Sequence, residues 1–202
     1  MKTIKTFYFL LLLTVCMTFS SCKDNQIAKD IQGTWSRDFI DDDDGIKMRT
    51  KETITFAYVE DELIGGTFDE RKDGIFDTEM EDIEDSYIRI SLYSTIKGTY
   101  EILDGDLYLK YDVNSLKLNL SPDDIELDIK DEDFLKEMKQ TEMSIDELKV
   151  VLAEEWKETF LEELRKGYLD NHPDGAYPDV KIEGKQLSFT TADQGVLTYI
   201  RQ

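Results

Sequence analysis

The sequence predicts a mainly β fold, an antiparallel barrel or strongly curved sheet of about eight to ten strands, with a two-helix insertion before the last strands. Short runs rich in β-branched and aromatic residues recur from residue 32 to the C-terminus, and Asp-Gly and Gly-Gly pairs punctuate them. One apolar stripe at helical spacing interrupts this pattern late in the chain. No fixed-period repeat and no linker rich in Pro, Gly or Ser appears, so residues 31–202 are predicted to form one domain.

Residues 1–22 have the features of a secretory leader. A basic start precedes an uncharged apolar run over residues 7–17, which is too short to span a bilayer because spanning takes about 20 residues. The ending FSSC at residues 19–22 resembles the lipobox of bacterial lipoproteins, with Phe19 where Leu is usual. The resemblance implies that cleavage leaves a lipidated Cys22 as the N-terminus. The alternative is a plain secretory signal that is cut before a free cysteine.

The cysteine count agrees with lipidation. Cys16 lies inside the leader, so Cys22 is the only thiol of the mature chain and no internal disulfide can form. Residues 23–30 are then expected to act as a flexible tether between the membrane and the domain. Their start, Lys-Asp-Asn, resembles the tails of surface-exposed outer-membrane lipoproteins. The expected location is the cell envelope, at the outer membrane, facing the periplasm or the cell surface.

The charge balance limits the partners. Two of the 24 basic residues lie in the leader, so 22 basic and 45 acidic residues remain, a net charge of −23. Nucleic-acid readers depend on Lys and Arg to neutralise phosphates, so no nucleic-acid partner is expected. Two acidic loops, at residues 41–44 and 69–85, are predicted instead, and a basic protein partner would suit them.

The predicted strands follow one another with short turns between them. They cover residues 32–40, 52–59, 63–68, 87–96, 99–103, 107–113, 116–120 and 125–129. Clean alternation in two of them places six side chains on inward faces: Ile54, Phe56, Tyr58, Ile88, Ile90 and Leu92. Asp-Gly at 104–105 and Glu-Gly at 183–184 predict tight hairpins, because glycine readily adopts the positive φ that such turns need.

A helical insertion is predicted over residues 131–170, with a short helix at about 132–140 and a longer one at 144–167. The stripe that defines the longer helix consists of Ile145, Leu148, Leu152, Trp156, Phe160, Leu164 and Tyr168. Ser144 and Glu147 form a capping box at its start, and Gly167 marks its predicted end. We expect the stripe to pack on the sheet, the alternative being an interaction surface. Three short strands complete the chain.

Motifs on the first and last strands resemble the lipocalin-like lipoprotein domains of bacterial outer membranes. Gly33-Thr34-Trp35 opens the first strand, a Gly-Thr-Tyr hairpin follows at mid-chain, and Arg201 ends the last strand. The resemblance implies that Trp35 plugs the closed end of the barrel and that Arg201 covers its ring in a cation–π contact. The alternative is an ordinary core Trp and a solvated Arg. The helical insertion departs from the family, whose helix normally follows the last long hairpin.

Two functions follow as expectations. In the first, a lipocalin-like cup binds a small apolar or amphipathic ligand, and the candidate lining residues are Phe56, Tyr58, Ile88, Ile90 and Tyr108. The same residues can equally form the packed core of a small barrel. In the second, the barrel is filled and the acidic lipoprotein is an interaction or scaffolding protein without a small-molecule ligand. A pocket of roughly several hundred Å³ distinguishes the two.

The sequence contains no catalytic signature, so an enzyme is not expected, nor is a cofactor. Its single histidine, His172, lies in a turn next to a proline, which excludes Cys-His and Ser-His catalysis and zinc sites of the Cys/His kind. Glycoside hydrolases use a pair of carboxylates, but with 45 acidic residues such pairs occur by chance and do not indicate this activity. Asp69, Asp73 and Gly74 partly mimic a calcium loop, but Arg71 replaces an oxygen ligand there. A solvated acidic loop is therefore favoured over a metal site.

Overall fold

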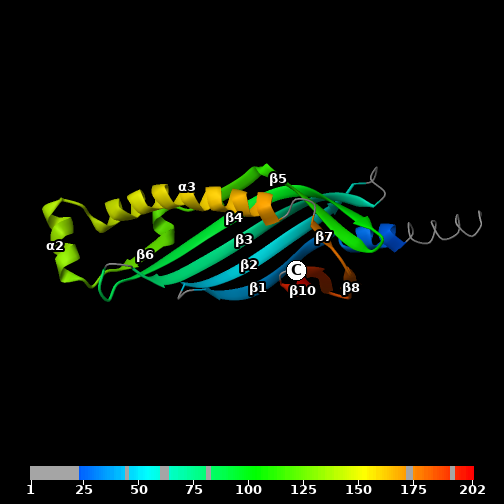
Figure 1. Ribbon diagram of the computed structural model, residues 1–202, viewed down its shortest axis with the longest axis horizontal. Coiled ribbons are helices and arrows are strands. Elements are labelled where there is room, and N and C mark those ends of the chain that lie inside the picture. Colours follow the sequence, from blue (N-terminus) through cyan, green and yellow to red (C-terminus); the bar gives the residue numbers. More distant parts are fainter. Residues whose placement is uncertain (1–22, 44–45, 60–63, 81–82, 172–174, 192–193) are drawn as a thin grey trace, which may run out of the picture.

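The computed structural model describes residues 23–43, 46–59, 64–80, 83–171, 175–191 and 194–202. In these residues the chain forms a ten-stranded antiparallel sheet that curls into a half-barrel, and two helices precede the final strands (Figure 1). The predicted fold class is therefore confirmed. Among the helices described, none combines the length and the apolar character that crossing a lipid bilayer requires.

Five long strands form a meander in which each pairs with the next. They are β1 (Gly33–Asp43), β2 (Ile46–Tyr58), β3 (Gly65–Glu79), β4 (Tyr87–Leu103) and β5 (Asp106–Asn119). The prediction that the residues of β4 and of β5 form two strands each was wrong. Pairing between them is continuous apart from a register shift between Thr95 and Lys97, so a bulge bends the ladder without ending it.

The acidic segment 69–85, predicted as a loop, lies largely within β3. Its outward acids pair with bases on neighbouring strands: Asp77 lies 3.1 Å from Arg49, and it also accepts from Arg89 at 2.5 Å. These ion pairs offset the repulsion that favoured a loop. The extended backbone also excludes the partial calcium loop. The predicted loop at 41–44 is likewise strand as far as Asp43, and residue 44 lies outside the described residues.

The insertion consists of α2 (Glu132–Gln140) and α3 (Ile145–Asn171), after the short 3-10 helix η1 (Pro122–Asp124) and strand β6 (Ile125–Asp128), which pairs with β4. The predicted capping box is present: the Glu147 backbone N–H donates to Ser144 Oγ at 3.2 Å, and the Ser144 backbone N–H donates to Glu147 Oε2 at 2.8 Å. The predicted stripe packs on the sheet, where it contacts a cluster around Ile125. The helix continues past Gly167, because the stripe carries on to Tyr168, which is buried.

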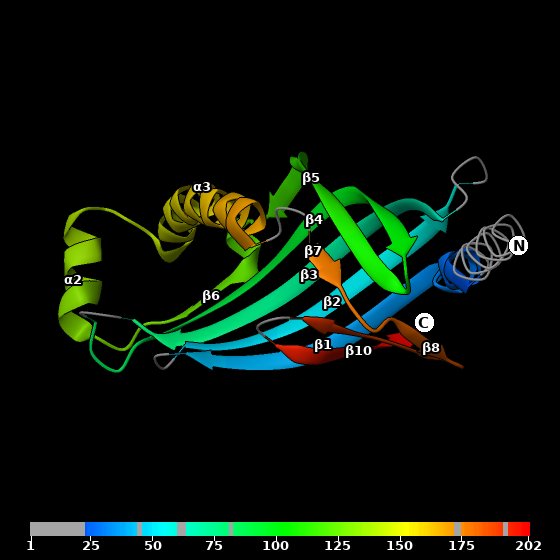
Figure 2. The ribbon, with the colours of Figure 1, turned by 45° about the vertical axis from the view of Figure 1, so that its right-hand side comes forward.

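Four short strands complete the chain, one more than predicted: β7 (Gly175–Tyr177), β8 (Lys181–Glu183), β9 (Gln186–Thr191) and β10 (Gly195–Arg201). β7 pairs with β5 and β10 pairs with β1, so they extend opposite sides of the meander. The curl brings these sides together, as Figure 2 shows. The Tyr177 and Phe189 rings lie 5.2 Å apart, and the Thr190 N–H donates to the Pro178 carbonyl at 2.9 Å. We call this the closed end.

The predicted flexible tether is instead a helix docked on the closed end. Residues 23–30 are helical, and Ala28 and Ile31 are completely buried. The Asp24 carboxylate accepts the backbone N–H groups of Asp104 and Gly105 at 3.0 and 2.9 Å, which fastens the segment to the β4–β5 turn. These contacts place the segment on the domain, where a flexible spacer was predicted.

Candidate functional site

The interior of the closed end is filled by side chains. Its largest fully buried members are Trp35, Tyr100, Tyr199, Phe56, Phe68 and Phe189. The Trp35 Nε1–H donates to the Ile31 carbonyl at 2.6 Å, and the Arg201 guanidinium lies 4.4 Å from the centre of the Trp35 ring. The contact predicted between Trp35 and Arg201 is therefore present. The interior of the closed end is thus a packed core.

The five residues predicted to line a ligand site do not share one cavity. Phe56 belongs to the closed-end core, and Tyr58 packs partly buried against it. Ile88 and Ile90 lie in a separate cluster beneath α3. Tyr108 is half-buried between two buried neighbours of β5, so it faces the other side of the sheet. The prediction was wrong on this point because long strands carry inward residues of β2 and β4 to different ends of the sheet.

A groove lies between α3 and the concave face of the sheet, and we call it the α3 groove. Its volume is about 370 Å³, and its walls are mostly apolar. Strands β3 and β4 form one wall and the C-terminal half of α3 forms the other. The Phe76 and Phe160 rings stack across it, 6.0 Å apart at an interplanar angle of 7°. The lining residues are Lys72, Phe76, Leu92, Phe160, Glu163, Leu164, Gly167 and Tyr168.

Lys72 belongs to a network of charges beside the groove, in which two carboxylates are buried and the Lys72 side chain is 31% exposed. Its Nζ lies 3.0 Å from Glu70 Oε1 and 3.3 Å from Glu52 Oε1. The Glu52 carboxylate also pairs with Arg37 on β1. Glu52 and Glu70 are only 4% and 2% exposed, so each needs a partner to offset the loss of hydration. Cross-strand pairing supplies those partners, because Glu52 lies opposite both Arg37 and Lys72.

Three tyrosine hydroxyls complete the network. Tyr168 on α3 donates to Glu70 Oε1 at 2.7 Å, and Tyr111 on β5 donates to Glu70 Oε2 at 3.0 Å. Tyr199 on β10 donates to Glu52 Oε2 at 2.8 Å. Burial, together with the nearby Glu70 carboxylate, raises the pKa of Tyr168 far above its ordinary value, so it stays a donor. The network thus joins α3 and the closed end to the middle of the sheet.

Glu52 and Lys72 each stabilise the charged state of the other. Burial raises the pKa of Glu52, but Lys72 and Arg37 outweigh it and leave the pKa below the ordinary 4.5. Burial lowers the pKa of Lys72, but Glu70 and Glu52 raise it well above 10.5. The site was missed at the sequence level, although one signal exists. Glu52 shares the alternation of Ile54 and Phe56, which places a carboxylate on the inward face.

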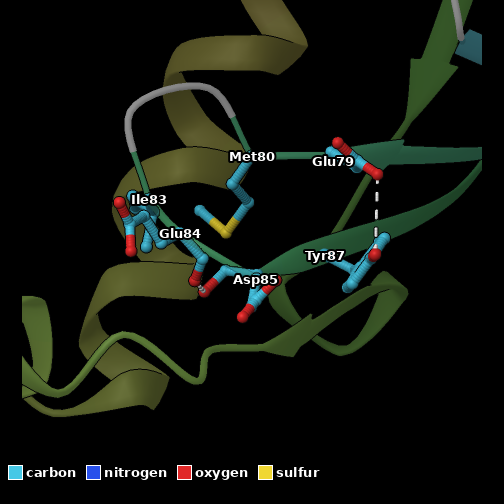
Figure 3. Close-up of a pocket in the computed structure, with 7 residues that line it drawn as sticks. Glu79, Met80, Ile83, Glu84, Asp85 and Tyr87 are labelled. Atoms are coloured by element: carbon cyan, nitrogen blue, oxygen red, sulfur yellow. Dashed lines mark hydrogen bonds between the residues drawn. The ribbon is translucent and has the colours of Figure 1, made fainter.

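A second hollow, of about 390 Å³, lies at the turn between β3 and β4 (Figure 3). It is lined by the acids Glu79, Glu84 and Asp85 among others. Figure 3 shows Glu79 beside Tyr87, whose hydroxyl donates to it at 3.5 Å, and apart from Glu84. Within the described part of the chain, no group of three or more His, Cys, Asp or Glu is placed to hold a metal ion.

No protein-family model and no curated protein sequence matches this chain. The resemblance to lipocalin-like lipoproteins therefore rests on the sequence motifs alone. Two residues singled out in the sequence, Cys22 and His172, lie outside the described residues.

Proposed function

We propose that this protein is a membrane-anchored lipoprotein with a lipocalin-like domain, and that its α3 groove binds a small apolar or amphipathic ligand. The observation that carries the proposal is the groove itself. Its volume of about 370 Å³ and its mostly apolar walls, with a few polar groups at Lys72, Glu163 and Tyr168, are typical of ligand sites. The ligand would lie under α3, outside the filled closed end.

Lipidation of Cys22 would anchor the domain at the outer membrane. The leader supports this proposal through its resemblance to a lipobox, and the docked helix 23–30 adds a geometric consequence. With no flexible spacer after Cys22, the closed end would face the membrane and α3 would be held away from it. Figure 1 shows residues 23–30 at one end of the long axis and α2 at the other. Cys22→Ser should release the protein from the membrane fraction, and unchanged fractionation would contradict the anchor.

Gly167 offers a direct test of the groove. It lines the groove, and a Cβ added there would meet no atom within 4 Å, so the position accepts a side chain at its Cβ. We expect native mass spectrometry of protein purified from its own host to show a bound small molecule. Gly167→Leu should lose that molecule, whereas Gly167→Ala, which adds little volume, should keep it. Equal retention by both variants would place the ligand elsewhere.

The filled closed end favours a second candidate, an acidic interaction or scaffolding lipoprotein. Under this alternative the described hollows stay empty and the partner is a basic protein. Absence of a co-purifying molecule, together with no binding of alkyl probes to the purified chain, would favour it over the ligand-binding proposal.

A further inference from the structure

We infer that the ligand of the α3 groove is an uncharged amphiphile, whose polar group lies at the Lys72 end and whose apolar part lies between Phe76 and Leu164. The inference rests on the proposed function and deepens it by naming the class of ligand. It depends on how completely the charges beside the groove already satisfy one another.

The polar end of the groove offers no free cation to an anionic ligand. The Lys72 ammonium already has two carboxylate partners, at 3.0 Å in Glu70 and 3.3 Å in Glu52. A ligand carboxylate placed beside Lys72 would lie near both of these acids. Arg37, the other base, is held by Glu52 on the far side of the network. An anion would therefore lose hydration without gaining an uncompensated positive charge.

The two buried carboxylates at this end are already engaged, so neither is open to a cationic ligand. The other acid that lines the groove, Glu163, is exposed on α3, where an ion pair with a ligand would gain little because both ions stay hydrated. Glu70 Oε1 accepts from Lys72 and Tyr168, and Glu70 Oε2 accepts from Tyr111. Both Glu52 oxygens are engaged as well, one by Lys72 and the other by Arg37 and Tyr199. These two acids and two bases carry no net charge together. A hydroxyl or other neutral polar group avoids the cost of stripping water from an unpaired ion.

Three probes with the same alkyl chain test the charge preference: decanol, decanoate and decylamine. Titration calorimetry of the mature chain at pH 7 should show decanol binding at least about tenfold more tightly than either ion. Decanoate or decylamine binding as tightly as decanol would overturn the inference while leaving the proposed function intact. Binding of none of the three would instead contradict the proposed function.

Two substitutions break the neutrality in opposite directions. Glu70→Gln leaves one positive charge in excess and should raise the affinity for decanoate, relative to decanol, by about tenfold. Lys72→Gln leaves one negative charge in excess and should do the same for decylamine. Glu162→Gln is the matched control, because Glu162 is exposed on α3 and does not line the groove. Circular dichroism identifies the variants that fold. If a folded variant binds the ion and decanol with the same ratio of affinities as the wild type, the inference is overturned.

Discussion

The Arg201 guanidinium covers the Trp35 ring at 4.4 Å, and the two residues are paired across β10 and β1. Arg201 also donates to the Asp30 carbonyl, so the last strand holds both the first strand and the docked N-terminal helix. Arg201 thus connects the N-terminal and C-terminal segments of the domain, which meet at the closed end.

Removing this contact should destabilise the protein. Arg201→Ala should lower the free energy of unfolding by about 2 kcal/mol, because a desolvated cation–π contact contributes about that much. Arg201→Lys keeps a cation over the ring and should lose less. Urea denaturation followed by circular dichroism measures both variants. Equal midpoints for Arg201→Ala and the wild type would show that the guanidinium contributes nothing.

Asp24 should determine whether the N-terminal helix stays docked. Asp24→Ala removes both acceptors of the Asp104 and Gly105 N–H groups and should cost about 2 kcal/mol, since a buried donor is then left unsatisfied. Limited proteolysis should cut residues 23–30 faster in this variant. Lys29→Ala is the control, because Lys29 is exposed on the same helix. Identical cleavage in both variants would contradict the role of Asp24.

The charge network predicts the pH range of stability. The pKa of Glu52 is lowered in the folded state, so its contribution is present above its ordinary pKa of 4.5 and is lost as the pH falls through the folded pKa. Lys72 has a raised pKa, so its contribution is present below 10.5 and is lost as the pH rises through the folded value. The melting temperature should therefore fall at both low and high pH, as thermal melts over a pH series would show.

Substitution of Glu52 separates the acid limb from general acid unfolding. Glu52→Gln should cost about 3 kcal/mol at pH 7, because it leaves Arg37 and Lys72 with one buried carboxylate fewer. The variant should then lose less further stability than the wild type between pH 5 and pH 3. If both proteins lose the same stability between pH 5 and pH 3, that loss is due to carboxylates other than Glu52.

Thr50 carries a buried hydroxyl for which the described residues provide no hydrogen-bond partner. Thr50→Val replaces it with a methyl group of similar shape and should raise the free energy of unfolding by about 1 kcal/mol. Thr55→Val is the comparison, since the Thr55 hydroxyl lies 3.1 Å from that of Thr34 and its loss should not stabilise. Chemical denaturation of both variants gives the two values. A destabilised Thr50→Val would indicate a partner for the hydroxyl.

Gly167 should lower the stability of helix α3. Gly167→Ala should raise the free energy of unfolding by about 1 kcal/mol, because glycine is a poor helix former and the added methyl group meets open space. Thermal denaturation measures the change. A fall in stability would indicate that the position needs glycine for its backbone conformation.

The sequence by itself determined the features that local spacing records. Alternation of period two marked the strands, the 3.6-residue stripe marked α3 and its buried face, and Asp-Gly marked the turn at Gly105, where φ is +86°. The contact between Trp35 and Arg201 was also predicted, but only through the resemblance of the motifs on the first and last strands to lipocalin-like domains.

Only the tertiary structure decided which inward residues fill a core and which border a groove. Phe56 and Ile88 have the same alternation pattern, but strand register and curl place one in the closed end and the other under α3. Glu52 and Glu70 looked like surface acids until pairing set them beside Lys72. The alternation in β2 places the Glu52 carboxylate inward but does not name its partners. Those partners come from other strands and from α3, so the energies of these contacts depend on the completed fold.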